Sequence, residues 1–311
     1  MMTFTLDDIF ANIYRVANTL PVEDFSRSMR FGEHRSQFRG DGHDFDRVVE
    51  YDPQVHSLSQ VDWRSMDYKR RVYVRESRVT KEFPVVVMAD MSTSMLFGVD
   101  SQNKERMLLE SIGDIGLSCH HAQDPMGFIG FAEDIIFDEE PRVGESQLYY
   151  LIGETFNFFE CLTEDARGKL SKHVTNFHNA FDFFSRKYAN RQCLLVVVSD
   201  FVGMEEVVKS PVLQDVASRH EVVFIFLDDP LEFTINKGPG SIRMENIEDG
   251  EQLVVARRNL DKIGSEIRQA RKRMREEDLK ELRIDSIVLE YGKHFQRLYR
   301  FFIGIEESFR V

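Results

Sequence analysis

Three short apolar segments, each leading to an aspartate, constrain the fold of this chain of 311 residues more than any other feature. The segments are residues 84–89 before Asp90, residues 193–198 before Asp200, and residues 222–227 before Asp228. Each has the length of a strand and is apolar throughout, which is typical of strands buried on both faces of a parallel sheet. The sequence therefore predicts an α/β fold with a doubly wound, mainly parallel sheet and helices on both faces.

Segments with helical periodicity separate and follow these strands. Helices are expected at residues 104–123 and 177–188, and a long charged helix from about 257 to 282. Further strands are expected at residues 126–131, 135–137 and 286–290, a hairpin at 241–244 and 252–255, and a terminal helix at 294–302. Ligands of such sheets bind at the carboxyl ends of the strands, so the residues that follow the strands are the candidates for a site.

The first 80 residues differ in character from the rest. Residues 1–20 predict an amphipathic helix and not a signal peptide, because charged residues interrupt the apolar ones. The following residues are rich in Arg, Gly and aromatics, and alternation at 71–75 predicts a strand. We therefore divide the chain into residues 1–80, an N-terminal helix and Gly/Arg-rich region packing on the core as an extension or small β-containing lobe, and residues 81–311, the α/β domain with its C-terminal long helix, strand and helix.

Composition narrows the classes of function. The formal net charge of −13 argues against nucleic acid as a partner, because binding to phosphates needs positive charge. The three cysteines lack metal-finger spacing and suit reduced thiols. No apolar run approaches the roughly 20 residues that a membrane span needs. We expect a cytoplasmic protein without a membrane span, and the sequence leaves its oligomeric state open.

Five oxygen-bearing side chains are expected at one edge of the sheet. Asp90, Ser92 and Ser94 follow the first buried strand, Thr175 precedes the helix at 177–188, and Asp200 follows the next apolar strand. Carboxylate and hydroxyl oxygens are ligands for Mg²⁺ or Mn²⁺ and not for zinc. Taken alone, the Asp-x-Ser-x-Ser pentapeptide is more often a loop with a helix cap; the two other loops favour a metal site.

At these residues the chain resembles a von Willebrand factor A domain. The metal-ion-dependent adhesion site (MIDAS) of that domain takes Asp-x-Ser-x-Ser, a Thr and a later Asp from three such loops, and all five positions match here. The chain also resembles the bacterial and archaeal family known as domain of unknown function 58. The motifs that carry this likeness are Val61-Asp62-Trp63-Arg64, Val72-Tyr73-Val74-Arg75-Glu76, Gly32-x-His34-x-Ser36 and Ser199-Asp200-Phe201. Residues 51–57 depart from the family's usual Gly-Asp-Asp turn.

The resemblance implies a function in binding. A hydroxyl-rich site leaves an open position on the cation, which a carboxylate from another protein can fill. Members of the resembled family are associated with MoxR-type AAA+ ATPases, and this chain has no G-x-x-x-x-G-K-[ST] loop of its own. We therefore expect a non-enzymatic, metal-dependent interaction module, an adaptor of a MoxR-type AAA+ ATPase or of another protein that presents acidic residues, in protein assembly or chaperone-like remodelling.

Two other functions stay open from the sequence. The chain could be a metal-dependent hydrolase or phosphatase with Asp90 as nucleophile, although phosphatases of the haloacid-dehalogenase type need a second Asp where this chain has Ser92. It could also be an α/β scaffold without an ion. Elsewhere, the acidic stretch 133–165 is more simply a solvated face than a steering patch. His120 and His121 suit the end of a helix better than a zinc site.

Overall fold

The computed structural model describes part of the chain, in twelve segments. They are residues 4–17, 39–40, 44–51, 73–78, 84–96, 104–165, 174–204, 207–228, 241–245, 252–256, 269–290 and 294–302. The chain forms two compact units, one made of Met1–Met29 and Phe83–Val311 and the other of Arg30–Glu82.

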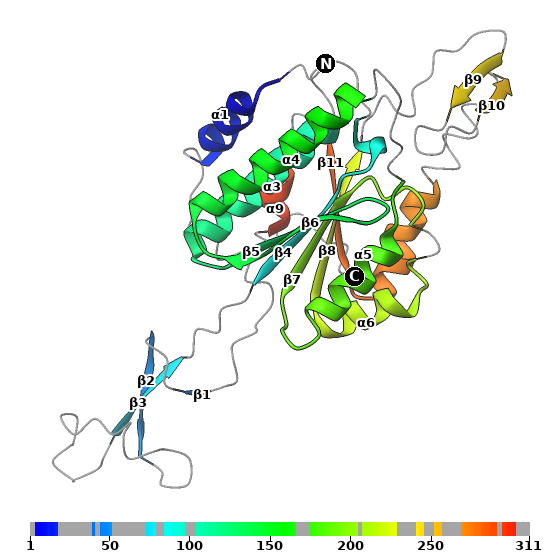
Figure 1. Cartoon of the computed structure of the whole chain (residues 1–311). Coiled ribbons are helices and arrows are strands. Elements are labelled where there is room, and N and C mark those ends of the chain that lie inside the picture. The colour runs from blue at the N-terminus through cyan, green and yellow to red at the C-terminus, as the bar shows by residue number, and fades with distance from the viewer. Residues whose placement is uncertain are drawn as a thin grey trace. The chain divides into compact units, whose positions relative to one another are not determined.

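A six-stranded sheet forms the centre of the larger unit (Figure 1). Its strands are β4 (Val85–Asp90), β5 (Met126–Phe131), β6 (Ile135–Arg142), β7 (Leu194–Ser199), β8 (Glu221–Asp228) and β11 (Asp285–Glu290). Their order is β11-β8-β7-β4-β5-β6, and only β6 runs antiparallel to its neighbour. Every residue of β4, β5 and β7 is buried, which explains why these segments are apolar throughout. The predicted α/β class and mainly parallel sheet are confirmed.

Helices flank this sheet. They include α3 (Lys104–Ala122), α4 (Glu145–Asp165), α5 (Phe177–Lys187), α6 (Pro211–Arg219), α8 (Leu279–Glu281) and α9 (His294–Phe302), with a π-helical turn at Met274–Asp278 and a 3-10 turn at Thr93–Leu96. Figure 1 shows α3 and α4 on one side of the sheet and α5 and α6 on the other. Aromatic rings fill the layer under α5, where Phe181 stacks on Phe224 at 6.1 Å between centroids.

The N-terminal helix α1 (Leu6–Ala17) packs across α3. Ile13 is buried and lies over Gly113, whose missing side chain makes room for it. Next to this contact, Asn12 Nδ2 donates a hydrogen bond to Glu110 Oε1 at 2.8 Å. The described part of α1 therefore holds the outer surface of α3, and α3 is fixed between this helix and the sheet.

The smaller unit contains a three-stranded antiparallel sheet. Its strands are β1 (Arg39–Gly40), β2 (Asp44–Glu50) and β3 (Tyr73–Arg78), in the order β1-β3-β2. The strand expected at 71–75 corresponds to β3, two residues further along. Most motifs that carry the family resemblance in this unit, including Trp63 and the Gly32 segment, lie outside the described residues.

Several secondary-structure predictions are confirmed and others need correction. The hairpin forms as β9 (Ser241–Glu245) and β10 (Gln252–Ala256), and the last strand and helix lie where expected. The strand expected at 135–137 extends to Arg142 and is antiparallel. The sequence reading did not include the helices α4 and α6. Of the long helix expected from 257, the structure describes residues 269 onward, so its first part stays a prediction.

Among the residues that the structure describes, no helix combines the length and the apolar character that crossing a membrane requires.

Gly130 links the sheet to the loop that follows β4, and it offers a test of the packing there. A Cβ atom at Gly130 would lie 2.3 Å from Met91 Sδ and 3.1 Å from Phe137 Cε1. Met91 is fully buried, so its side chain has no free space to enter. We expect Gly130→Ala to lower the free energy of unfolding by about 1–3 kcal/mol, as overpacked cores do, measured by urea denaturation.

Gly153, in the middle of α4, is the matched control. Apart from its two chain neighbours and the nearby backbone of its own helix, no atom of the described residues lies within 4 Å of the position its Cβ would take. Gly153→Ala should raise the free energy of unfolding by up to about 1 kcal/mol, because Ala is the better helix former. Equal effects of the two substitutions would contradict the packing described at Gly130.

Candidate metal site

The order of the strands brings Asp90 and Asp200 to neighbouring positions. Strands β4 and β7 are parallel neighbours, with Ala89 paired to Val198, so both chains leave the sheet at the same edge. After β4 the chain passes to α3 on one side of the sheet, and after β7 it passes to α6 on the other (Figure 1). In α/β sheets such a divergence marks the place where ligands bind, in the crevice outside the carboxyl ends of the strands.

Hydrogen bonds and ring contacts tie the loop of Thr175 to the same edge. The backbone N–H of Asn176 donates to the carbonyl of Ala132 at 2.9 Å, just beyond β5. The ring of Phe177 lies 5.6 Å from that of Phe131, the last residue of β5, and 5.7 Å from that of Phe201. Thr175 is half-buried between these anchors. The structure therefore brings together the three loops that carry the five predicted ligands.

The loop after β4 is a turn closed by its own polar groups. Asp90 is fully buried, and its Oδ1 accepts a hydrogen bond from the backbone N–H of Ser92 at 2.9 Å. The hydroxyl oxygens of Ser92 and Ser94 lie 2.9 Å apart, with Ser92 buried and Ser94 half-buried. Asp90, Ser92 and Ser94 thus belong to one compact turn, as the Asp-x-Ser-x-Ser spacing predicts.

Ser199 is a site residue that the sequence reading did not assign. Its hydroxyl donates to Asp90 Oδ2 at 2.5 Å and accepts from the backbone N–H of Phe201 at 2.9 Å. Phe201 has a φ of 54°, in the left-handed region that bulky residues rarely adopt, and its ring is buried. The hydroxyl of Ser199 therefore joins the turn after β7 to the carboxylate after β4.

Lys104 is a second residue of the site that is not among the predicted ligands. Its Nζ lies 2.7 Å from Asp200 Oδ2, and each of the two side chains is only 1% exposed. The other oxygen of this carboxylate, Oδ1, accepts from the backbone N–H of Val202 at 3.2 Å. A sequence signal for this pair existed: a lysine at the first residue of a helix opposes the helix dipole and needs a nearby carboxylate.

The two carboxyl groups differ in their electrostatics. Burial, and after it the negative charge of Asp200, raise the pKa of Asp90 to about 7, against the hydrogen bonds from Ser199 and Ser92. Burial also acts to raise the pKa of Asp200, but the charge and hydrogen bond of Lys104 outweigh it, and the pKa lies below its usual value. When both are ionised, the two carboxylates carry one more negative charge than the ammonium group of Lys104 balances.

These residues fit a divalent cation. Two carboxylates and three hydroxyls are hard oxygen ligands, and the unbalanced negative charge at Asp90 favours a bound cation. In the described segments no group of three or more His, Cys, Asp and Glu side chains could hold a metal.

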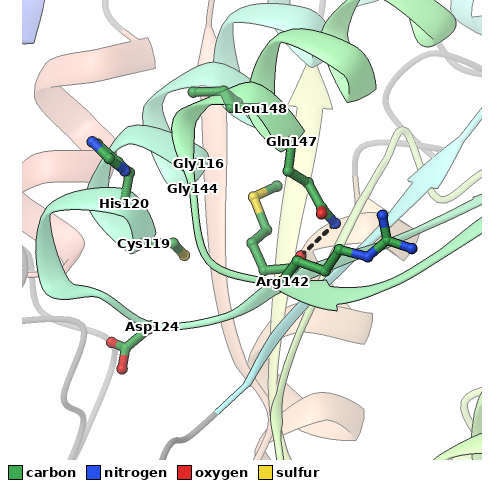
Figure 2. Close-up of a pocket in the computed structure, with 9 residues that line it drawn as sticks. Gly116, Cys119, His120, Asp124, Arg142, Gly144, Gln147 and Leu148 are labelled. Atoms are coloured by element: carbon green, nitrogen blue, oxygen red, sulfur yellow. Dashed lines mark hydrogen bonds between the residues drawn. The ribbon is translucent and has the colours of Figure 1, made fainter.

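A small hollow lies at the opposite end of the sheet (Figure 2). It is lined by Gly116, Cys119, His120, Asp124, Met126, Arg142, Gly144, Gln147 and Leu148. Met126 is the first residue of β5, so the hollow lies at the amino end of that strand, away from the crevice. His120 lies here, at the carboxyl end of α3. The hollow and the predicted metal site are therefore separate.

Another buried carboxyl group, that of Glu105, directly follows Lys104 in the sequence. It is 1% exposed, and its Oε1 has no hydrogen-bond partner among the described residues. Burial raises the pKa of Glu105 to about 7.

Comparison with known proteins gives one family. The family model described as "Protein of unknown function DUF58" matches residues 49–277. No curated protein matches the chain.

The chain is also similar to solved structures. The conserved hypothetical protein BatB of Bacteroides thetaiotaomicron is 16% identical over 74% of this chain and 100% of its own, with a TM-score of 0.39. An aerotolerance-related membrane protein of Bacteroides fragilis is 17% identical over 71% and 98%, with a TM-score of 0.41. An uncharacterized membrane spanning protein of Vibrio fischeri is 9% identical over 72% and 100%, with a TM-score of 0.24. Identities and TM-scores this low do not bear on function.

The Ser199 hydroxyl joins Asp90 to the Phe201 N–H, so its removal should lower the stability of the fold. Ser199→Ala removes a buried donor from Asp90 and a buried acceptor from the Phe201 N–H, and should lower the free energy of unfolding by roughly 1–3 kcal/mol in urea denaturation. Ser218 is the control, since its exposed hydroxyl donates only to the carbonyl of Asp215. Ser218→Ala should change the free energy by less than about 0.5 kcal/mol. Similar small losses for both variants would contradict the bridge.

The buried Glu105 predicts a dependence of stability on pH. Its pKa is raised from the usual 4.5 to about 7 in the fold, so the folded state disfavours the ionised form. Stability is therefore lost as the pH rises through this interval. Glu105→Gln should be more stable than the wild type at pH 8, and the difference should shrink below pH 5, measured by urea denaturation at both pH values. A difference that is the same at the two pH values would refute this assignment.

Proposed function

The chain belongs to the DUF58 family, and we propose that it is a non-enzymatic, metal-dependent protein-interaction module with a doubly wound fold of the von Willebrand A type. One divalent cation, Mg²⁺ or Mn²⁺, would be held by Asp90, Ser92, Ser94, Thr175 and Asp200. The observation that carries the proposal is the meeting of their three loops at the crevice between β4 and β7, with two buried carboxyl groups side by side.

The chemistry of the ligands supports binding to a carboxylate. When bound, a divalent cation would offer an open coordination position to an Asp or Glu of another protein. The three hydroxyl ligands are neutral, so the chain itself supplies only two anionic ligands. The bound cation would then still attract an anion, and this attraction would serve to recognise a carboxylate of the partner protein.

The surroundings of Asp90 support a role in binding over one in catalysis. Both of its carboxylate oxygens accept hydrogen bonds, from the Ser92 N–H and the Ser199 hydroxyl, and the side chain is fully buried. A nucleophilic carboxylate needs a free oxygen that faces the substrate. Asp90 therefore suits a fixed ligand better than a nucleophile.

Exposed apolar side chains next to the site support a protein partner. Val174 is 37% exposed and precedes Thr175, and Val202 is 45% exposed and lies two residues beyond Asp200. A protein that places a carboxylate over the crevice would also cover these two valines. Apolar surface that a partner covers contributes to affinity.

The class of partner comes from the family resemblance. We propose that the module acts as an adaptor of a MoxR-type AAA+ ATPase in protein assembly or chaperone-like remodelling, in the cytoplasm, and that the ATPase or its client presents the acidic residue.

Metal binding can be tested through thermal stability. Mg²⁺ in excess should raise the melting temperature of EDTA-treated protein by about 5 °C, since a ligand at 100 times its Kd contributes about 2.7 kcal/mol. Asp90→Ala should abolish this rise. The measurement is a thermal melt of each variant with and without Mg²⁺ or Mn²⁺.

Asp182 gives the matched control, because its carboxylate is on α5 and pairs with Arg186. Asp182→Ala should keep the full response to Mg²⁺. The same variants test the partner: a MoxR-type ATPase should be retained by wild type and Asp182→Ala only when Mg²⁺ is present, and not by Asp90→Ala. Melting curves of the wild type that do not respond to either cation would rule out the proposed function.

A further inference from the structure

The ammonium group of Lys104 lies inside the candidate metal site. It is 2.7 Å from the carboxylate of Asp200, and neither side chain is more than 1% exposed. Lysine is almost never fully buried unless it is paired, and the first residue of α3 is an unfavourable place for a positive charge. The carboxylate of Asp200 therefore holds this lysine in place.

Among the residues that the structure describes, the formal charges at this position do not cancel. Asp90 and Asp200 carry two negative charges when ionised, and Lys104 carries one positive charge. Arg271 also acts on Asp200, but it is itself paired with Asp228 at 2.9 Å. One negative charge is left, in a place where both carboxyl groups are buried.

A divalent cation reverses this balance. Two carboxylates and a divalent cation sum to zero, so Lys104 leaves the occupied site with one positive charge. One carboxylate from a partner then restores neutrality. If the lysine were neutral, the same partner would add an unbalanced negative charge to a buried site, which is unfavourable.

We propose that Lys104 is a resident cation with two opposite effects on binding. Its positive charge weakens the binding of the divalent cation, and it strengthens the binding of a partner's carboxylate once the divalent cation is bound. This inference rests on the proposed function and names the residue that regulates it. The cation and the carboxylate then bind cooperatively, and each raises the affinity for the other. The module binds its partner tightly only when the divalent cation is bound and the partner presents a carboxylate.

A purely structural role makes a different prediction. If Lys104 only fastens the amino end of α3 to the turn after β7, its replacement lowers stability and leaves the affinities for cation and carboxylate unchanged. The two roles therefore differ in binding and not in stability.

The test uses the full chain with Lys104→Gln, whose amide can still donate to Asp200 but carries no charge. Mg²⁺ binding to EDTA-treated protein is measured by titration calorimetry, in chloride and in acetate buffers of equal ionic strength, with acetate as the carboxylate probe. In the wild type, acetate should raise the apparent affinity for Mg²⁺. In Lys104→Gln, the affinity in chloride should rise about tenfold or more, because a like charge beside the cation is gone, and the effect of acetate should disappear.

Lys187→Gln is the matched control. Lys187 is paired with Asp138 at 2.6 Å and Glu140 at 2.9 Å, at the end of α5 that is remote from the crevice. This variant also loses a lysine that binds two carboxylates, and it should keep the wild-type affinity for Mg²⁺ and the wild-type effect of acetate.

The outcomes separate this inference from the proposed function. A wild type that binds Mg²⁺, together with a Lys104→Gln variant of unchanged affinity or unchanged acetate effect, overturns the role of Lys104 and leaves the proposed function standing. A wild type that binds neither Mg²⁺ nor Mn²⁺ overturns both. Lys104→Gln and Lys104→Met are expected to be less stable without cation and to recover in saturating Mg²⁺, which replaces the missing charge; failure of both to recover also overturns the inference.

Discussion

The side-by-side pairing of β4 and β7 is the constraint on which the rest of this molecule depends. Because the two strands are parallel and their chains leave on opposite sides of the sheet, two buried carboxyl groups become neighbours. Burying two like charges together is unfavourable, and the surrounding residues offset this cost with hydrogen bonds and an ion pair. Ser92 and Ser199 donate to one carboxylate, and Lys104 and the N–H of Val202 donate to the other.

The position of α3 matters to this arrangement because its first residue is Lys104. The helix is held from within by the sheet and from outside by α1, through Ile13 over Gly113 and the hydrogen bond between Asn12 and Glu110. The N-terminal helix thus contributes, through α3, to fixing the position of the Lys104 charge. The described part of α1 is in this sense a support for the site.

Physical reasons separate what the sequence could predict from what it could not. The strands at 84–89, 193–198 and 222–227 were predictable, because burial on both faces leaves an unbroken apolar run. Helix α4 was predictable as well, since Leu148, Leu151, Ile152, Phe156 and Phe159 recur at helical spacing and are buried; its acidic residues drew the interpretation toward charge instead. The contacts of Lys104 and Ser199 join positions about a hundred residues apart. They depend on the order of the strands, which local patterns do not determine.

The backbone conformation of Phe201 links the position of Asp200 to the aromatic core, so substitutions in that core can alter the candidate metal site. Its backbone is held in a left-handed conformation one residue after Asp200, while its ring packs on those of Phe177, Phe224 and Phe226. The aromatic interior thereby balances an unfavourable torsion at the rim. A substitution of Phe177, Phe224 or Phe226 would let the turn relax, and the Asp200 oxygens would move with the turn. At the proposed metal site, the affinity for the ion would thus depend on the packing of the hydrophobic interior, even when every oxygen ligand is kept.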